Sequence, residues 1–145
     1  MRVGETSKTT LHFDIDPKDF SVAGQASAAV KRTLKKLGFN PVVIRKVAIA
    51  MYEGEINMVI HANGGVIDVE ISPRQIICVL ADEGPGIPDI ALAMQEGYST
   101  ASQDVRELGF GAGMGLPNMK KYTDELKIDT VVGKGTTLTL VVNNQ

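Results

Sequence analysis

The 145-residue sequence predicts an α+β domain in which one layer of helices covers one face of a mixed, mostly antiparallel sheet. Three observations support this two-layer α/β sandwich. The length is typical of one domain, and residues 1–145 contain no internal repeat and no sign of a second domain. Five segments have the spacing of strands, and three have the spacing of helices. Their order is strand, two helices, two strands, an irregular segment, a helix and two strands.

The first strand is predicted over residues 9–16, where Leu11 and Phe13 alternate with polar side chains and share one face. The first helix is predicted over residues 20–38, because apolar side chains recur there at near-helical spacing. Gly38 is a typical residue for the end of a helix, so it is expected to stop this one.

A second helix is expected from about Pro41 to His61. Asn40 is a favourable N-cap residue, and proline is favourable at the first helical position. Gly54 lies inside this helix, where glycine costs about 1 kcal/mol relative to alanine. It could let a neighbouring element or a nucleotide pack closely, or it could simply be tolerated.

The second half of the chain continues with two strands, over residues 66–71 and 75–82, joined by a proline-containing turn. Regular spacing is then lost between about Asp82 and Gly115, in a stretch rich in glycine, proline, serine and aspartate. An irregular stretch of this length is most often a functional loop or lid. The chain is completed by a helix over residues 116–124 and by strands over residues 125–132 and 136–142.

The composition argues against nucleic-acid binding as the class of function. The formal net charge is −2, so the sequence as a whole does not indicate a basic surface. Two small basic clusters, one formed by Lys31-Arg32 with Lys35-Lys36 and one by Lys120-Lys121, are interpreted as solvated helix faces.

The single cysteine and the absence of long apolar stretches indicate a cytoplasmic protein without a membrane segment. Cys78 lies in an apolar run, so packing in a strand explains it better than catalysis. The first 15 residues do not resemble a signal peptide. No run of about 18 apolar residues is present that could span a membrane.

Glu53, Asn57 and His61 are four residues apart in the second predicted helix, so they project from one face. The side-chain oxygen of Asn57 could bind a hard cation, and Glu53 could accept a proton in the same pocket. The alternative is an exposed polar stripe, which is common on amphipathic helices.

Asp82 ends a predicted buried strand, and Gly84 and Gly86 follow it. A carboxylate in this place could accept a hydrogen bond from an exocyclic amine, and the glycines could let a flat ligand approach the backbone. An ordinary turn is the alternative. Similarly, the sequence GKGT at residues 133–136 could be a plain hairpin turn.

Gly109, Gly111, Gly113 and Gly115 occupy alternate positions before the helix that is predicted to begin near Leu116. Their spacing fits neither a G-x-G-x-x-G fingerprint nor a phosphate loop that ends in G-K-[ST]. What remains is a run of unobstructed backbone N–H groups that leads into a helix N-terminus, which favours phosphate.

In this order, E-x-x-x-N on a helix, D-x-G-x-G after a strand, a glycine run before a helix and G-x-G-T before the last strand resemble the Bergerat (GHKL) ATP-binding fold. The resemblance covers about Lys46 to Val142. Within that superfamily the chain is most similar to the small anti-sigma-factor serine/threonine kinases. The sequences DEGPGIPDI, GYST, GFGAGMGLPNMKKYTDEL and GKGTT look most like the stressosome switch-kinase branch.

The resemblance implies a role for each matching residue on the catalytic side of the site. Asn57 would be a ligand of the Mg²⁺ that bridges the ATP phosphates, and Glu53 would be the general base. Arg106, in the lid, could reach the γ-phosphate or could be solvated. The lid and the phosphate-facing helix start would be formed by Gly109, Gly111, Gly113, Gly115 and Leu116.

The resemblance also implies an adenine side of the site. Asp82 would accept a hydrogen bond from the adenine amino group, and Thr136 would support that contact. Gly84 and Gly86 would make room for the base and the ribose.

The implied function is that of an ATP- and Mg²⁺-dependent protein serine/threonine kinase. Its substrate would be a STAS-domain antagonist or scaffold protein in a partner-switching pathway of the anti-sigma-factor type. Two alternatives stay open, namely an ATP-gated switch that sequesters a sigma factor or other regulator with little kinase activity, and a stand-alone catalytic domain of a histidine kinase. The first helix could also mediate a homodimer.

Overall fold

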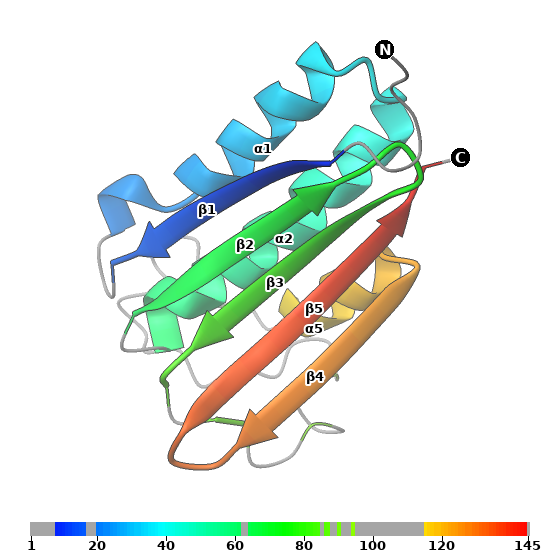
Figure 1. Ribbon diagram of the computed structural model, residues 1–145. Coiled ribbons are helices and arrows are strands. Elements are labelled where there is room, and N and C mark those ends of the chain that lie inside the picture. The colour runs from blue at the N-terminus through cyan, green and yellow to red at the C-terminus, as the bar shows by residue number, and fades with distance from the viewer. Residues whose placement is uncertain are drawn as a thin grey trace.

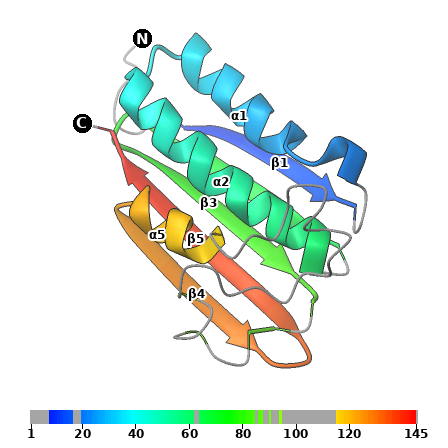
Figure 2. The ribbon, with the colours of Figure 1, turned by 180° about the vertical axis from the view of Figure 1, so that it is seen from behind.

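The computed structural model describes residues 8–16, 20–61, 64–84, 86–87, 90, 94 and 115–144. Within these ranges the chain forms a five-stranded sheet with helices on one face, as Figures 1 and 2 show from opposite sides. The elements in chain order are β1 (Thr9–Ile15), a short 3-10 helix (Phe20–Val22), α1 (Gln25–Lys36), α2 (Pro41–His61), β2 (Gly65–Ile71), β3 (Gln75–Asp82), α5 (Gly115–Lys121), β4 (Glu125–Val131) and β5 (Gly135–Asn143). The predicted two-layer α+β fold is therefore confirmed.

The strands lie in the order β1-β2-β3-β5-β4, so the last strand in the sequence lies inside the sheet. All neighbouring pairs among these strands are antiparallel, so the described sheet is antiparallel throughout rather than mixed. Ala81 of β3 pairs with Thr137 of β5. The insertion of β5 therefore brings the end of β3 beside the start of β5.

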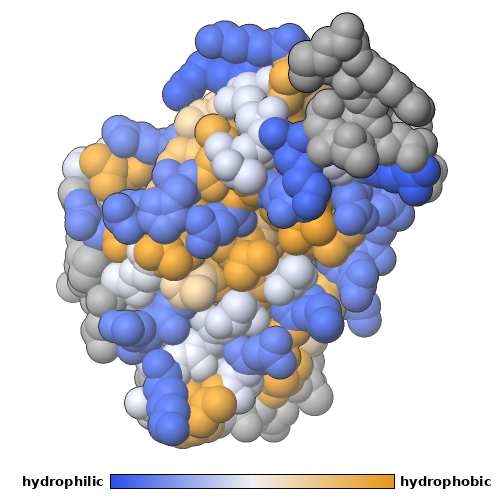
Figure 3. Space-filling view, in the orientation of Figure 1, coloured by the Kyte–Doolittle hydropathy of each residue, from blue (hydrophilic) through white to orange (hydrophobic). Residues whose placement is uncertain are grey.

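Alternation along the strands decides which side chains face the helices. On β3, Cys78 and Leu80 are buried in the core, whereas Ile77 and Val79 point to the opposite face. Figure 3 looks onto that opposite face, where hydrophilic and hydrophobic residues are mixed. Burial raises the pKa of the Cys78 thiol to about 12, so the thiol remains protonated at neutral pH. The predicted packing role of Cys78 is confirmed.

The helix α2 has the bounds that the sequence predicts. Asn40 caps it, because its Oδ1 atom accepts a hydrogen bond from the Val42 N–H at 2.8 Å, and Pro41 is the first helical residue. The helix ends at His61, as expected. None of the described helices, α2 included, is long and apolar enough to cross a bilayer.

The helix α5 is shorter than predicted, because it spans Gly115–Lys121 instead of residues 116–124. The Asp124 N–H does not continue the helix. It donates to the Val141 carbonyl oxygen at 2.8 Å, which joins the chain to the sheet before β4 begins.

The prediction of one helix over residues 20–38 is wrong at its start. Gly24 separates the 3-10 turn from α1 and has a φ angle of +95°, in the left-handed region that glycine tolerates best. A Cβ atom at Gly24 would also lie 3.0 Å from Cε1 of Tyr52. The end is as predicted, with Gly38 just after the helix at a φ of +79°.

The N-terminus of α1 is capped by a side chain from another helix, Glu55 of α2. Gly24 has no side chain to cap with, and the first turn of α1 has no acidic residue. Glu55 Oε2 accepts hydrogen bonds from the N–H groups of Gly24 at 2.9 Å and Ala26 at 3.2 Å. Glu55 Oε1 accepts from the N–H of Ser27 at 3.0 Å and from its hydroxyl at 2.6 Å. Glu55 is only 1% exposed, so this cap is buried.

Gly54, the residue before Glu55, lets α2 approach the sheet. A Cβ atom at Gly54 would lie 2.5 Å from Cδ2 of Leu80 and 3.4 Å from Sδ of Met119. Of the roles left open for this glycine, close packing of a neighbouring element is the one that the structure shows.

We predict that Glu55→Ala lowers the free energy of unfolding by about 2–4 kcal/mol, because it leaves the buried N–H groups at the start of α1 without an acceptor. Urea denaturation measures the change. Glu70→Ala is the matched control, since Glu70 pairs with Lys8 at the surface and should cost less than about 1 kcal/mol. Equal, small effects of both substitutions would contradict the capping role.

We predict that Gly54→Ala destabilises the protein by about 1–2 kcal/mol, although alanine is the better helix former. The new methyl group would overlap Leu80 Cδ2. Leu80→Val removes that atom, so the double variant should lose less stability than the sum of the two single variants. Strict additivity in the same denaturation assay would show that the contact does not matter.

Candidate functional site

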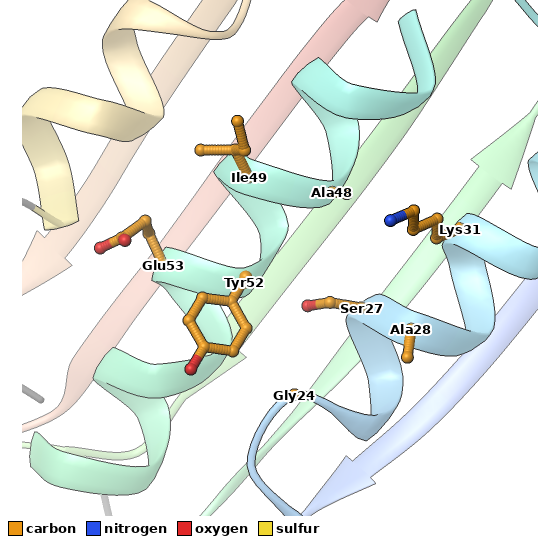
Figure 4. A pocket seen from close by; sticks show the side chains of 8 residues that line it. All are labelled: Gly24, Ser27, Ala28, Lys31, Ala48, Ile49, Tyr52 and Glu53. Carbon is orange, nitrogen blue, oxygen red and sulfur yellow. The ribbon is translucent and has the colours of Figure 1, made fainter. Parts of the chain in front are cut away.

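Glu53 and Asn57 lie one turn apart on α2, on the side that meets the first turn of α5. A Cβ atom on Gly115, the first residue of α5, would lie 2.8 Å from Asn57 Nδ2. The Glu53 carboxylate accepts a hydrogen bond from Asn118, and Figure 4 shows Glu53 pointing from α2 toward α5. The structure thus brings both residues to the start of α5. The side chain of His61 lies outside the described residues.

The Glu53 carboxylate is half-buried, and this burial raises its pKa above the ordinary value for glutamate. The hydrogen bond from Asn118 opposes the shift but does not cancel it. A poorly solvated carboxylate is a better proton acceptor than a freely hydrated one, and among the described residues no cation forms an ion pair with Glu53.

Asp82, at the end of β3, is held by two backbone groups. Its Oδ1 atom accepts hydrogen bonds from the N–H groups of Gly84 at 2.8 Å and Thr136 at 3.1 Å. Because both bonds use Oδ1, the orientation of the carboxylate is fixed while Oδ2 takes no part in them. Asp82 can therefore present one oriented oxygen to a donor on a ligand.

Thr136 supports Asp82 through its backbone N–H, whereas its hydroxyl group is engaged elsewhere. The Oγ1 atoms of Thr136 and Thr130 are 2.9 Å apart and share a hydrogen bond. Thr130 Oγ1 also accepts from the Ile87 N–H at 2.8 Å, which fixes the chain beyond Gly86 to the end of β4, beside the β4–β5 turn. Thr130 was missed from the sequence, although its inward position on β4 among apolar residues could have drawn notice.

The two halves of the site are joined by the packing of α2 on the end of β3. Gly54 of α2 packs on Leu80, two residues before Asp82. Met58 of α2 packs on Gly65, which pairs with Asp82 across the sheet. The helix that carries Glu53 and Asn57 therefore covers the strand end that carries Asp82.

Some of the remaining predicted site residues are described by the structure, and the others lie outside the described residues. Leu116 and Thr136 are 7% and 6% exposed, so their side chains belong largely to the interior. Gly84 is buried beside Asp82, and Gly86 lies next to the Val131 backbone. Outside the described residues lie Arg106, Gly109, Gly111 and Gly113.

The described residues contain no group of three or more His, Cys, Asp or Glu side chains that could hold a metal ion by themselves. Asn57 still offers a side-chain oxygen, and no hydrogen bond to another described residue occupies it. Mg²⁺ commonly takes only one or two protein ligands and completes its shell with phosphate oxygens and water. Asn57 fits such a site.

Comparison with known families and structures identifies the family and the fold. The family model described as "Histidine kinase-like ATPase domain" matches residues 17–142. In a solved structure of the RsbU and RsbW domains of a Mycobacterium tuberculosis protein, a similar fold is found with a TM-score of 0.61 and 18% identity. That likeness covers 92% of this chain and 32% of the other, and at this identity it concerns the fold alone.

Two named relatives are more similar in sequence. The serine/threonine-protein kinase RsbT of Bacillus subtilis (strain 168) is 33% identical over 110 residues, which cover 73% of this chain and 77% of RsbT. An anti-sigma F factor of Thermoanaerobacter sp. (strain X514) is 36% identical over 98 residues, which cover 64% of this chain and 65% of that protein. The resemblance read from the motifs is confirmed, and the chain belongs to the histidine kinase-like ATPase domain family.

Proposed function

We propose that this protein is an ATP- and Mg²⁺-dependent protein serine/threonine kinase that acts in the cytoplasm on a STAS-domain antagonist or scaffold protein of a partner-switching pathway. The observation that carries the proposal is the half-buried Glu53 carboxylate of raised pKa, held next to Asn57 at the start of α5. Transfer of phosphate to a hydroxyl group benefits from a general base, whereas nucleotide binding alone does not require one. The similarity to RsbT, whose name describes a serine/threonine-protein kinase, supports the same choice.

The end of β3 would hold the adenine. Asp82 Oδ2 would accept a hydrogen bond from the exocyclic amine, because Gly84 and Thr136 already fix Oδ1. The Thr130–Thr136 pair keeps that arrangement rigid from the side of the β4–β5 hairpin. A preorganised acceptor of this kind costs little reorganisation when the base arrives.

Asn57 would hold Mg²⁺ through its side-chain oxygen, and the start of α5 beside it would face the phosphates. When bound, MgATP supplies the transferable phosphoryl group and the metal charge that neutralises it. Glu53 would take the proton from the serine or threonine hydroxyl of the substrate, with Asn118 keeping the carboxylate in position. Phosphorylation would add about 1.5–2 negative charges to the substrate and so alter its partnerships.

A second candidate function is a nucleotide-gated switch that sequesters a sigma factor or another regulator and transfers phosphate poorly. The similarity to a protein named as an anti-sigma F factor supports this second candidate. The two functions differ in what they require of Glu53, because sequestration needs no general base.

We predict that Asn57→Ala removes the Mg²⁺-dependent part of ATP binding, with a loss of affinity of at least about tenfold, since the side-chain oxygen is the proposed protein ligand. Titration calorimetry with and without Mg²⁺ measures it. Asn143→Ala, at the exposed end of β5, is the control of equal chemistry and should bind as the unmodified chain does. If Asn57→Ala binds MgATP with unchanged affinity, the metal assignment fails.

We predict that Glu53→Gln binds ATP normally but phosphorylates its STAS-domain substrate at least about 100-fold more slowly, because a general base contributes roughly 10²–10⁴ in rate. Only ionised Glu53 can accept a proton, so the rate of the unmodified enzyme should fall as the pH is lowered through the raised pKa of Glu53. That acid limb should be absent in the variant.

Phosphoserine and phosphothreonine on the substrate are quantified by mass spectrometry, with STAS proteins encoded near this chain's gene as the first substrates to try. Glu125→Gln, an exposed substitution on β4, is the control and should transfer phosphate at the normal rate. Full activity of Glu53→Gln would exclude Glu53 as the base. Absence of transfer by the unmodified chain, with intact ATP binding, would favour the nucleotide-gated switch.

A further inference from the structure

A groove of about 360 Å³ runs between α1 and α2 on the outer surface of the helical layer. Figure 4 shows it from close by. Small residues on both helices leave the space open, among them Gly24 and Ala28 on one side and Ala48 on the other. Ile49 and Tyr52 of α2 give it an apolar and aromatic wall, and Tyr52 is 39% exposed. Partly exposed tyrosine is common in protein interfaces.

Glu53 connects this groove to the proposed catalytic site. It lines the groove, whereas Asn57, Asp82 and Thr136 do not. Its carboxylate points toward α5, so Glu53 stands where the outer face of α2 borders both the groove and the proposed nucleotide site. An acceptor chain that crosses this outer face could bring its hydroxyl to Glu53 without displacing the nucleotide.

The groove is also positively charged on the side away from Glu53. The sequence of α1 carries four cations and no carboxylate. Among the residues that the structure describes, none of these cations forms an ion pair. Lys31 lines the groove, and Figure 4 shows its side chain directed from α1 toward α2. The carboxylate of Glu55, which lies close by, is buried and used by the N-terminus of α1.

The positions of these charges can be related to Glu53 through helix geometry. Lys35 follows Lys31 by one turn on the same face of α1, and Arg45 lies two turns before Glu53 on α2. Both are exposed. With a rise of 1.5 Å per residue, Arg45 is about 12 Å from Glu53 along the axis of α2. An extended chain covers this distance in about three to four residues.

We propose that this groove binds the acceptor segment of the protein substrate as an extended chain that carries acidic side chains about two and four residues from the phosphorylated hydroxyl. This inference rests on the proposed kinase function and adds the site and the chemistry of the substrate. The hydroxyl lies at Glu53, and the apolar wall packs against the side chains next to it. Lys31 in the groove binds one acidic residue, and the exposed Lys35 and Arg45 beyond the lining residues bind the other. The Lys31–Lys36 cluster was interpreted from the sequence as a solvated helix face. In this proposal, part of the cluster binds acidic side chains of the substrate.

The test uses the full chain labelled with ¹⁵N and synthetic peptides of nine residues. Each peptide carries one serine and two glutamates, placed two and four residues either before or after the serine, with alanine elsewhere. A third peptide carries lysine in place of glutamate. Titration followed by NMR should shift the amide signals of Ala28, Lys31, Ala48 and Tyr52 with one of the glutamate peptides. The lysine peptide should shift them at least fivefold less at equal concentration.

Two double variants distinguish binding in the groove from a general attraction to the positive charge of α1. Lys31→Glu with Lys35→Glu reverses the charges along the groove and should weaken the glutamate peptide at least fivefold. Arg32→Glu with Lys36→Glu makes the same change of net charge on the same helix, away from the lining residues, and should weaken it less than twofold. Thermal unfolding checks that both variants are folded. Equal weakening by the two variants, or no weakening by either, overturns the proposal.

A single-stranded DNA oligonucleotide is titrated as a competing probe, because a cationic helix could also attract nucleic acid. Binding of DNA at the groove signals in place of the glutamate peptides would overturn the proposal. ATP is titrated into the same samples through the signals of Asp82 and Thr136. ATP binding without a peptide response overturns the groove assignment alone. A peptide response without ATP binding overturns the kinase function, and with it the role of the groove as an acceptor site.

Discussion

The buried Glu55 carboxylate is the contact on which the helical layer depends. A carboxylate in the interior is costly unless donors surround it, and the start of α1 supplies four hydrogen bonds. They can form only if α1 begins just after Gly24, which explains why the helix breaks there. The contact fixes the position of the start of α1 along the axis of α2. It thereby also fixes the groove between the two helices.

One turn of α2 combines three different contacts. Successive residues of a helix point about 100° apart. Glu53 therefore faces α5, Gly54 faces Leu80 of the sheet, and Glu55 faces the start of α1. Glu53, with the candidate catalytic carboxylate, is thus followed directly by Gly54, which packs on the sheet, and by Glu55, which caps α1. The Glu53 carboxylate is held in place by the neighbours that anchor the rest of the turn.

Features that depend on neighbouring residues could be predicted from the sequence, whereas those that depend on distant ones could not. Asn40 and Pro41 lie next to each other and fix the start of α2, so its bounds were predicted correctly. The break at Gly24 depends on Tyr52 and Glu55, about 30 positions away, and periodicity alone carries no sign of them.

In the candidate site, too, the sequence motifs could be predicted, whereas contacts between distant residues could not. The motifs and the family resemblance pointed to Glu53, Asn57 and Asp82. They did not reveal Asn118 or Thr130, because the contacts of these residues form only when α5 and β4 pack beside α2 and β5.

The position of β5 has a consequence for biosynthesis. This strand is the last in the sequence but lies between β3 and β4, and it supplies the Thr136 N–H that orients Asp82. While residues 135–143 are still inside the ribosome, β3 has an unpaired edge and the Asp82 carboxylate lacks the N–H of Thr136. A nascent chain therefore cannot complete this arrangement until β5 has left the ribosome and paired with β3.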